Sequence, residues 1–99
     1  MSGDPMEIIE AADPEFFKLL EMTRESAFTE SGIPMKYKLL MAMSLDAANG
    51  AVDGVKVLAM QAMQEGATKE EVMEAVKVAQ YICGVGSVYT AANALREIL

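Results

Sequence analysis

Helix-breaking residues recur along this 99-residue chain and divide it into short segments, which constrains its fold more than any other feature. The breaks fall at Asp13-Pro14, Ser31-Gly32-Ile33-Pro34, Asn49-Gly50, Gly66 and Gly84-Val85-Gly86. Proline ends a helix because it lacks an N–H donor, and glycine adopts the left-handed conformation common at helix ends. No interval between breaks shows the alternation of apolar and polar residues that marks a strand. The chain is therefore predicted to be all-α.

The intervals between the breaks carry apolar residues at helical spacing. This pattern predicts about five helices, at approximately 14–29, 35–49, 53–65, 69–83 and 87–99. Asp13 is the expected N-cap of the first, and Thr68-Lys69-Glu70-Glu71 is a capping box for the fourth. The side chains expected to be buried include Phe16, Phe17, Leu20, Ala27 and Phe28 in the first helix and Val72, Val76, Ala79 and Ile82 in the fourth. We predict one compact helical domain over residues 1–99.

Composition excludes several classes of protein. Hydrophobic residues make up 53% of the chain, which is too many for a disordered tail. The net charge is −7 and the eight Lys and Arg residues are scattered, so neither nucleic acid nor a membrane surface is an expected partner. No apolar run is long enough to span a membrane, and the acidic N-terminal segment does not resemble a leader peptide. A single cysteine forms no intrachain disulfide, and we predict a cytoplasmic location.

The helices expected at 35–49, 53–65 and 69–83 are apolar over wider arcs than a small bundle needs to bury. Large exposed apolar patches are uncommon on monomers, and subunit contacts are the usual way to cover them. The sequence therefore predicts a homo-oligomer.

A series of short motifs between residues 36 and 95 has a recognisable order. They are Lys36-Tyr37-Lys38-Leu39-Leu40-Met41-Ala42, Ala48-Asn49-Gly50, Ala62-Met63-Gln64-Glu65-Gly66-Ala67-Thr68-Lys69-Glu70-Glu71, Gly84-Val85-Gly86 and Ala91-Ala92-Asn93-Ala94-Leu95. This layout resembles the carboxymuconolactone decarboxylase and alkylhydroperoxidase D-like family. The resemblance implies an all-helical fold, assembly into trimers or hexamers, and decarboxylase or alkylhydroperoxidase activity.

The resemblance also implies where catalytic groups would lie. The redox branch of the family uses a glutamate, a CxxC pair and a histidine, which would fall at Leu39, Ala51, Gly54 and Leu58. None of those groups is present, and the chain contains no histidine. Decarboxylase-type members often lack the CxxC pair but keep the histidine, which Leu58 replaces. Alanine, glycine and leucine supply neither a nucleophile nor a proton donor, so we predict that this position is now core or subunit interface.

Two acidic residues and a lysine near those positions are candidate binding residues. Asp46 follows Leu39 by two helical turns, and Asp53 lies in the turn where the thiols would have been. Mutual repulsion would raise the pKa of one carboxyl group, whereas the structural alternative is solvation, with Asp53 as a helix N-cap. Lys56 is either a local cation or nucleophile, or an ordinary surface lysine.

Tyr81 and Cys83 are the remaining candidates. Cys83 precedes Gly84-Val85-Gly86 and would be reactive if the next helix N-terminus lowered its pKa. Its spacing from Ala79 and Ile82 also fits a small buried position, which is the interpretation we favour.

The sequence predicts a family member without the thiol-peroxidase relay that binds or acts on a small organic molecule at a subunit interface. The alternatives are a non-catalytic oligomeric protein with a structural or ligand-binding role, and an inherited peroxiredoxin-type antioxidant activity that has only Cys83 to use. No cofactor and no metal is predicted.

Overall fold

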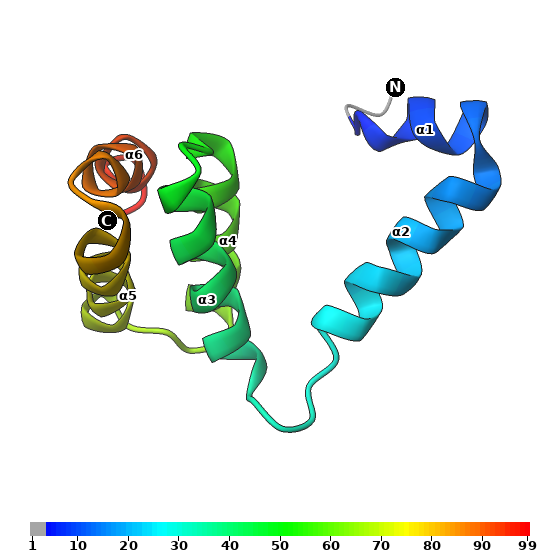
Figure 1. The fold of residues 1–99 in the computed structure, drawn as a ribbon. Coiled ribbons are helices and arrows are strands. Elements are labelled where there is room, and N and C mark those ends of the chain that lie inside the picture. The colour runs from blue at the N-terminus through cyan, green and yellow to red at the C-terminus, as the bar shows by residue number, and fades with distance from the viewer. Residues whose placement is uncertain (1–3) are drawn as a thin grey trace.

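The computed structural model describes residues 4–99, which form six α-helices and no strand (Figure 1). The helices are α1 Met6–Ala12, α2 Pro14–Ala27, α3 Met35–Ala48, α4 Val52–Gln64, α5 Lys69–Cys83 and α6 Gly86–Leu95. The predicted all-α class is confirmed. Five of the helices begin within one residue of their predicted starts; α1 was not predicted, and α6 ends four residues early.

Local chemistry explains most of the helix ends. The Asp13 carboxylate accepts a hydrogen bond of 3.1 Å from the Phe16 N–H, which confirms it as the N-cap of α2. Gly66 follows α4 with a φ of +98°, a conformation that glycine adopts without the steric cost paid by other residues. The N-cap of α4 is Ala51, so the alternative role of Asp53 as N-cap is wrong and Asp53 lies in the first turn instead.

Helices α3 to α6 pack into a bundle around one hydrophobic core. Its fully buried larger side chains are Met43, Val55 and Val72, one from each of α3, α4 and α5. Burying a side chain of this kind contributes about 1.5–3 kcal/mol. Alanines at 59, 62, 91 and 94 complete the contact surface between the helices. The bundle is thus held by small apolar residues that let neighbouring helix backbones approach closely.

Helices α1 and α2 pack against each other and form an arm, residues 6–27, that stands away from the bundle (Figure 1). Three hydrogen bonds hold the base of the arm. Lys38 Nζ donates to the carbonyl oxygens of Ala27 (2.9 Å) and Thr29 (2.6 Å), and the Met35 N–H donates to Glu30 Oε1 (2.7 Å).

The prediction that the α2 aromatic residues Phe16 and Phe17 are buried is wrong for the single chain. No arm residue is buried, and Phe16 is 47% exposed. The physical reason is the direction of the arm, which takes α2 away from the bundle so that only Phe28, at its base, packs against the core. Within residues 4–99, no helix is both long and apolar enough to cross a membrane.

Candidate functional site

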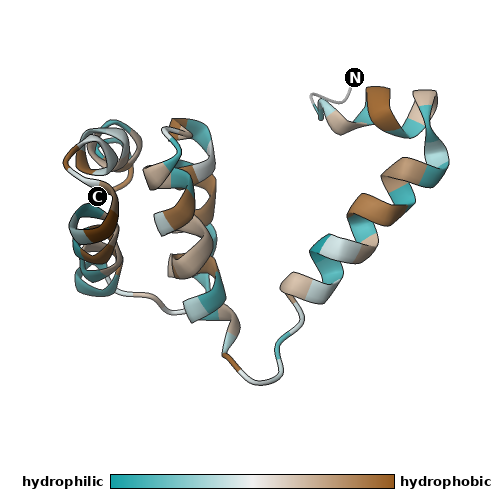
Figure 2. Cartoon of the chain, viewed as in Figure 1, coloured by the Kyte–Doolittle hydropathy of each residue, from teal (hydrophilic) through white to brown (hydrophobic). Residues whose placement is uncertain are grey.

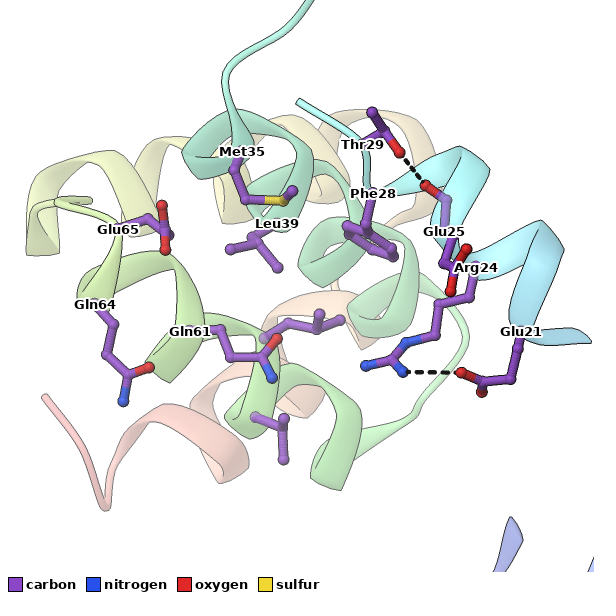
Figure 3. Close-up of a pocket in the computed structure, with 12 residues that line it drawn as sticks. Glu21, Arg24, Glu25, Phe28, Thr29, Met35, Leu39, Gln61, Gln64 and Glu65 are labelled. Carbon is purple, nitrogen blue, oxygen red and sulfur yellow. Dashed lines mark hydrogen bonds and ion pairs between the residues drawn. The ribbon is translucent and has the colours of Figure 1, made fainter. Parts of the chain in front are cut away.

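A cleft of about 760 Å³ lies between the arm and the bundle (Figure 3). Its lining comes from α2, from the segment that follows α2, and from α3 and α4. The lining residues are Glu21, Arg24, Glu25, Phe28, Thr29, Met35, Leu39, Val57, Leu58, Gln61, Gln64 and Glu65. Its volume falls in the range of small-molecule sites, roughly 300–1,000 Å³.

The floor of the cleft is apolar. It is formed by Leu39 and Met35 of α3, Val57 and Leu58 of α4, and Phe28 at the base of the arm. Leu39 is buried and Leu58 is half-buried against the core, whereas the Val57 side chain is 52% exposed. This part of the cleft offers van der Waals contact to an apolar group, but it contains no side chain able to transfer a proton.

The rim of the cleft is polar and predominantly acidic. Arg24 is the one basic residue in the lining, and its guanidinium Nη1 lies 3.7 Å from the carboxylate of Glu21. Figure 3 shows the side chains of Glu21, Arg24 and Glu25 extending from α2 toward the cleft. With Glu65 on the bundle side, the lining contains three carboxylates and one guanidinium, so its net charge disfavours anions.

The positions at which the resemblance placed a catalytic glutamate and histidine lie in this cleft, as Leu39 and Leu58. The two thiol positions lie at the start of α4 and do not line it. At one of them, Gly54, an added Cβ would overlap a carboxylate oxygen of Asp46 and lie 2.9 Å from Asp46 Cγ. The Asp46 side chain therefore occupies the space that a side chain at position 54 would need.

None of the predicted binding residues lines the cleft. Asp46 is half-buried against Gly54, and Asp53 is exposed in the first turn of α4. Lys56 Nζ forms an ion pair of 2.9 Å with Glu97 Oε2, which lowers the pKa of the Glu97 carboxyl group. Among residues 4–99, no three Cys, Asp or Glu side chains are grouped closely enough to hold a metal ion.

Tyr81 and Cys83 lie near the end of α5, where both are exposed, Tyr81 to 86%. The favoured burial of Cys83 is therefore wrong, as is the expected burial of Ile82, which is 73% exposed. The inward positions Val72, Val76 and Ala79 are buried as predicted. The difference arises because no other element of the described chain covers the last turn of α5.

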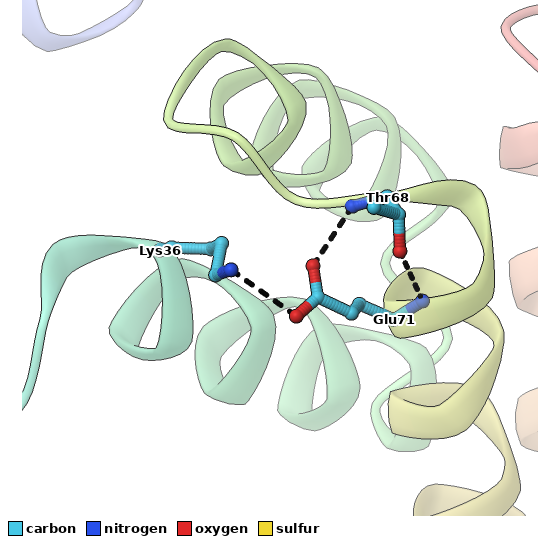
Figure 4. A network of polar contacts seen from close by, with 3 residues as sticks. All are labelled: Lys36, Thr68 and Glu71. Atoms are coloured by element: carbon cyan, nitrogen blue, oxygen red, sulfur yellow. Dashed lines mark hydrogen bonds and ion pairs between the residues drawn. The ribbon is translucent and has the colours of Figure 1, made fainter.

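A polar network outside the cleft joins the starts of α3 and α5 (Figure 4). Glu71 Oε1 accepts a hydrogen bond of 2.9 Å from the Thr68 N–H, and Thr68 Oγ1 accepts one of 3.0 Å from the Glu71 N–H, which confirms the predicted capping box. The other carboxylate oxygen of Glu71 lies 3.1 Å from Lys36 Nζ. The Thr68 backbone hydrogen bond and then Lys36 lower the pKa of Glu71, and hydrogen bonding to Glu71 raises the pKa of Lys36.

Sequence reasoning missed the cleft itself because the cleft lies between two segments that are far apart in the chain. The residues it missed are those of the rim, together with Val57 and Met35. The one local signal was the leucine pair, Leu39 and Leu58, at positions where the resemblance implies polar groups. That signal indicated a change in the site but not the presence of a cavity.

The sequence and the structure of this chain were compared with those of known proteins. The family model of the carboxymuconolactone decarboxylase family matches residues 14–97, which include α2 of the arm as well as the bundle. The apo crystal structure of a carboxymuconolactone decarboxylase family protein from Legionella pneumophila superposes with a TM-score of 0.84 at 25% sequence identity, covering 92% of this chain and 81% of that chain. Among curated proteins, none matches the sequence. The chain belongs to the carboxymuconolactone decarboxylase family.

Proposed function

We propose that this protein binds a small, neutral, largely apolar organic molecule in the cleft between the arm and the bundle. The observation that carries the proposal is the apolar floor formed by Leu39 and Leu58, enclosed on one side by a polar rim. Ligand sites of small molecules combine these two features, since the apolar surface supplies affinity and a few polar groups fix orientation.

The charge of the rim supports a neutral ligand over an organic acid. Glu21, Glu25 and Glu65 line the cleft, and the guanidinium of Arg24 is already paired with Glu21. A ligand carboxylate would meet more negative than positive charge there, and it would lose its hydration against the leucine floor. Gln61 and Gln64 at the rim offer hydrogen bonds that a hydroxyl or carbonyl group on a neutral ligand would accept or donate.

The proposed role does not include thiol-based peroxide reduction. Leu39 and Leu58 supply no group that would relay a proton, and Cys83 does not line the cleft. A single exposed thiol forms no intrachain disulfide, so a dithiol reductant would have no protein disulfide within the chain to reduce.

The test is a matched pair of probes that differ in charge. We expect 2-naphthalenemethanol to raise the melting temperature of the protein, because a ligand that binds only the folded state stabilises it. We expect 2-naphthoate, which has the same ring and a carboxylate, to raise it much less. Greater stabilisation by the acid would overturn the neutral-ligand proposal, and no stabilisation by either probe would overturn the site.

Three variants locate the binding. Leu58→Trp and Gln61→Trp both place a large ring in the cleft, and we expect both to abolish stabilisation by 2-naphthalenemethanol. Gln61 is exposed, so its substitution leaves the core packing intact. Leu45→Trp is the control, since Leu45 is 65% exposed and does not line the cleft. Equal loss in all three variants would contradict binding in the cleft.

A further inference from the structure

The direction of the arm is not set by packing between helices. Within residues 4–99, α2 packs closely along α1 and not along any helix of the bundle. Residues 28–34 join α2 to α3, and Figure 2 shows that most of this linker is polar or intermediate in hydropathy. Phe28 is the linker residue that packs against the core, but it lies at the pivot itself and so resists rotation of α2 only weakly. Other contacts of the linker therefore set the direction.

Lys38 of α3 holds the end of α2. Its Nζ donates hydrogen bonds to the carbonyl oxygens of Ala27, at 2.9 Å, and Thr29, at 2.6 Å. Ala27 is the last residue of α2, and the last carbonyl groups of a helix have no N–H partner within it. These groups also form the negative end of the helix dipole, where an ammonium group is favourable. Lys38 thus satisfies the C-terminal end of α2 from the bundle side of the linker.

Glu30 makes the complementary contact at the start of α3. Its Oε1 accepts a hydrogen bond of 2.7 Å from the N–H of Met35, the first residue of α3. Pro34, which precedes Met35 as the N-cap, has no polar side chain that could accept this bond. A carboxylate is favourable at the positive end of a helix dipole. A cation from α3 therefore meets the end of α2, and an anion from the linker meets the start of α3.

We propose that Lys38 and Glu30 form a clamp that sets the direction of the arm, and that Lys38 is a positioning residue of the ligand site. The hydrogen bonds of Lys38 to carbonyl oxygens on either side of the pivot have a preferred direction, whereas the apolar contact of Phe28 has none. Neither Lys38 nor Glu30 lines the cleft, so each acts on it only through the arm. The inference rests on the proposed function, because it concerns the same cleft.

The length of α2 makes the cleft sensitive to the clamp. The rim residues Glu21, Arg24 and Glu25 belong to α2, whereas the floor belongs to the bundle apart from Phe28 (Figure 3). Glu21 precedes Ala27 by six residues, which is about 9 Å along a helix. A turn of α2 by about 20° around Ala27 would therefore move Glu21 by about 3 Å. That displacement is comparable to the length of a hydrogen bond, so it would change the contacts of the rim with a bound molecule.

Pulsed EPR measures the direction of the arm without ligand. Nitroxide labels at the exposed positions Lys18→Cys on α2 and Gln80→Cys on α5, in a Cys83→Ser background, report the distance between arm and bundle. The labelled chain is refolded with an excess of unlabelled chain, so that each measured pair of labels belongs to one chain. We expect Lys38→Met and Glu30→Ala each to broaden the distance distribution or to shift its mean by about 3 Å or more. Lys38→Arg should keep the wild-type distribution, because a guanidinium also donates to two acceptors. An unchanged distribution in Lys38→Met or in Glu30→Ala would overturn the clamp.

Binding of 2-naphthalenemethanol tests the effect of the clamp on the cleft. By isothermal titration calorimetry below the melting transition, we expect Lys38→Met to raise the dissociation constant several-fold and Lys38→Arg to keep the wild-type value. Lys69→Met removes the same charge from an exposed lysine of α5 and should leave the constant unchanged. An unchanged constant in Lys38→Met, or an equal rise in Lys69→Met, would overturn the positioning role. Failure of the probe to bind the wild type would overturn the proposed function and the positioning role with it, whereas the distances between the labels would still test the clamp.

Discussion

Gly54 of α4 lies directly against the carboxylate of Asp46 on α3, so closely that a Cβ at position 54 would overlap a carboxylate oxygen. The contact forms at the end of the α3–α4 hairpin that carries Leu39 and Leu58. The contact joins two residues that the sequence analysis singled out for different reasons. The glycine stands where the resemblance implies a thiol, and the aspartate was a candidate binding residue. Asp46 therefore acts in packing, and a cysteine at position 54 would have to displace it.

A double-mutant cycle measures this relationship. Gly54→Ala gains helix propensity, about 0.5–1 kcal/mol, but forces the Asp46 carboxylate to move. We therefore expect Gly54→Ala to stabilise the protein by about 1 kcal/mol more in an Asp46→Ala background than in the wild type. Urea unfolding of the four proteins gives the coupling energy. Additive effects of the two substitutions would contradict the close approach.

The capping box at α5 makes a second prediction. Thr68 Oγ1 accepts the Glu71 N–H at 3.0 Å, and removing such an N-cap side chain costs about 1 kcal/mol. We expect Thr68→Ala to lower the free energy of unfolding by that amount, and Thr68→Ser to lower it much less because the hydroxyl is retained. Chemical denaturation of both variants provides the measurement. Equal losses would indicate that the methyl group, and not the hydrogen bond, matters.

The pH dependence of stability follows from the same network. The folded-state pKa of Glu71 is lowered, first by the Thr68 backbone hydrogen bond and then by Lys36. Its stabilisation is therefore complete above the ordinary glutamate pKa and is lost as the pH falls through the lowered value. We expect Glu71→Gln to flatten the loss of stability between roughly pH 5 and pH 3. Glu70→Gln, at the exposed neighbouring position, is the matched control, and an equal effect there would contradict the assignment.

The dependence of stability on pH in the alkaline range involves Lys36. Its pKa is raised, chiefly by the hydrogen bond to Glu71, so its contribution is present at neutral pH and is lost as the pH rises through the raised value. Lys36→Met should therefore weaken the alkaline dependence of the melting temperature. If the profile above pH 10 is unchanged in that variant, the ion pair has no measurable role in stability.

Local signals sufficed to predict the five main helices and the N-caps of two of them, α2 and α5. Asp13 and Thr68 hydrogen-bond to backbone groups only three residues away, so the pattern that predicts them is complete within a few positions. The inward stripe of α5 was also predictable at Val72 and Val76, which are buried in the core where α5 packs on α3 and α6.

Burial at the chain's periphery was not predictable from periodicity alone. Phe16 and Ile82 have the helical spacing of core residues, yet 47% and 73% of their surface is exposed. Periodicity indicates which side of a helix is apolar but not whether anything covers that side. The cleft was missed for a related reason. Arg24 and Gln61 both line it, but they are far apart in the sequence, and only the direction of the arm brings them to the same cleft.

The exposure of Cys83 predicts a reactive thiol. Cys83 is exposed at the C-terminal end of α5, so we expect it to react stoichiometrically with Ellman's reagent in the native protein, at a rate similar to that after unfolding in urea. Cys83→Ser should leave the free energy of unfolding within about 0.5 kcal/mol of the wild-type value, as surface substitutions usually do. Slow or substoichiometric labelling of the native protein would indicate that another copy covers this end of α5.

Peroxide turnover tests the proposal that this protein lacks thiol-based peroxide reduction. A thiol peroxidase cycle oxidises a first thiol to a sulfenic acid, which a second thiol then resolves as a disulfide while water leaves. The chain has one cysteine, and the cleft positions Leu39 and Leu58 carry no proton-transfer group. We expect no reduction of tert-butyl hydroperoxide above the uncatalysed rate with dithiothreitol as reductant, and the same result for Cys83→Ser. Multiple turnovers that persist in Cys83→Ser would show that the protein reduces peroxide by a route that uses none of its thiols.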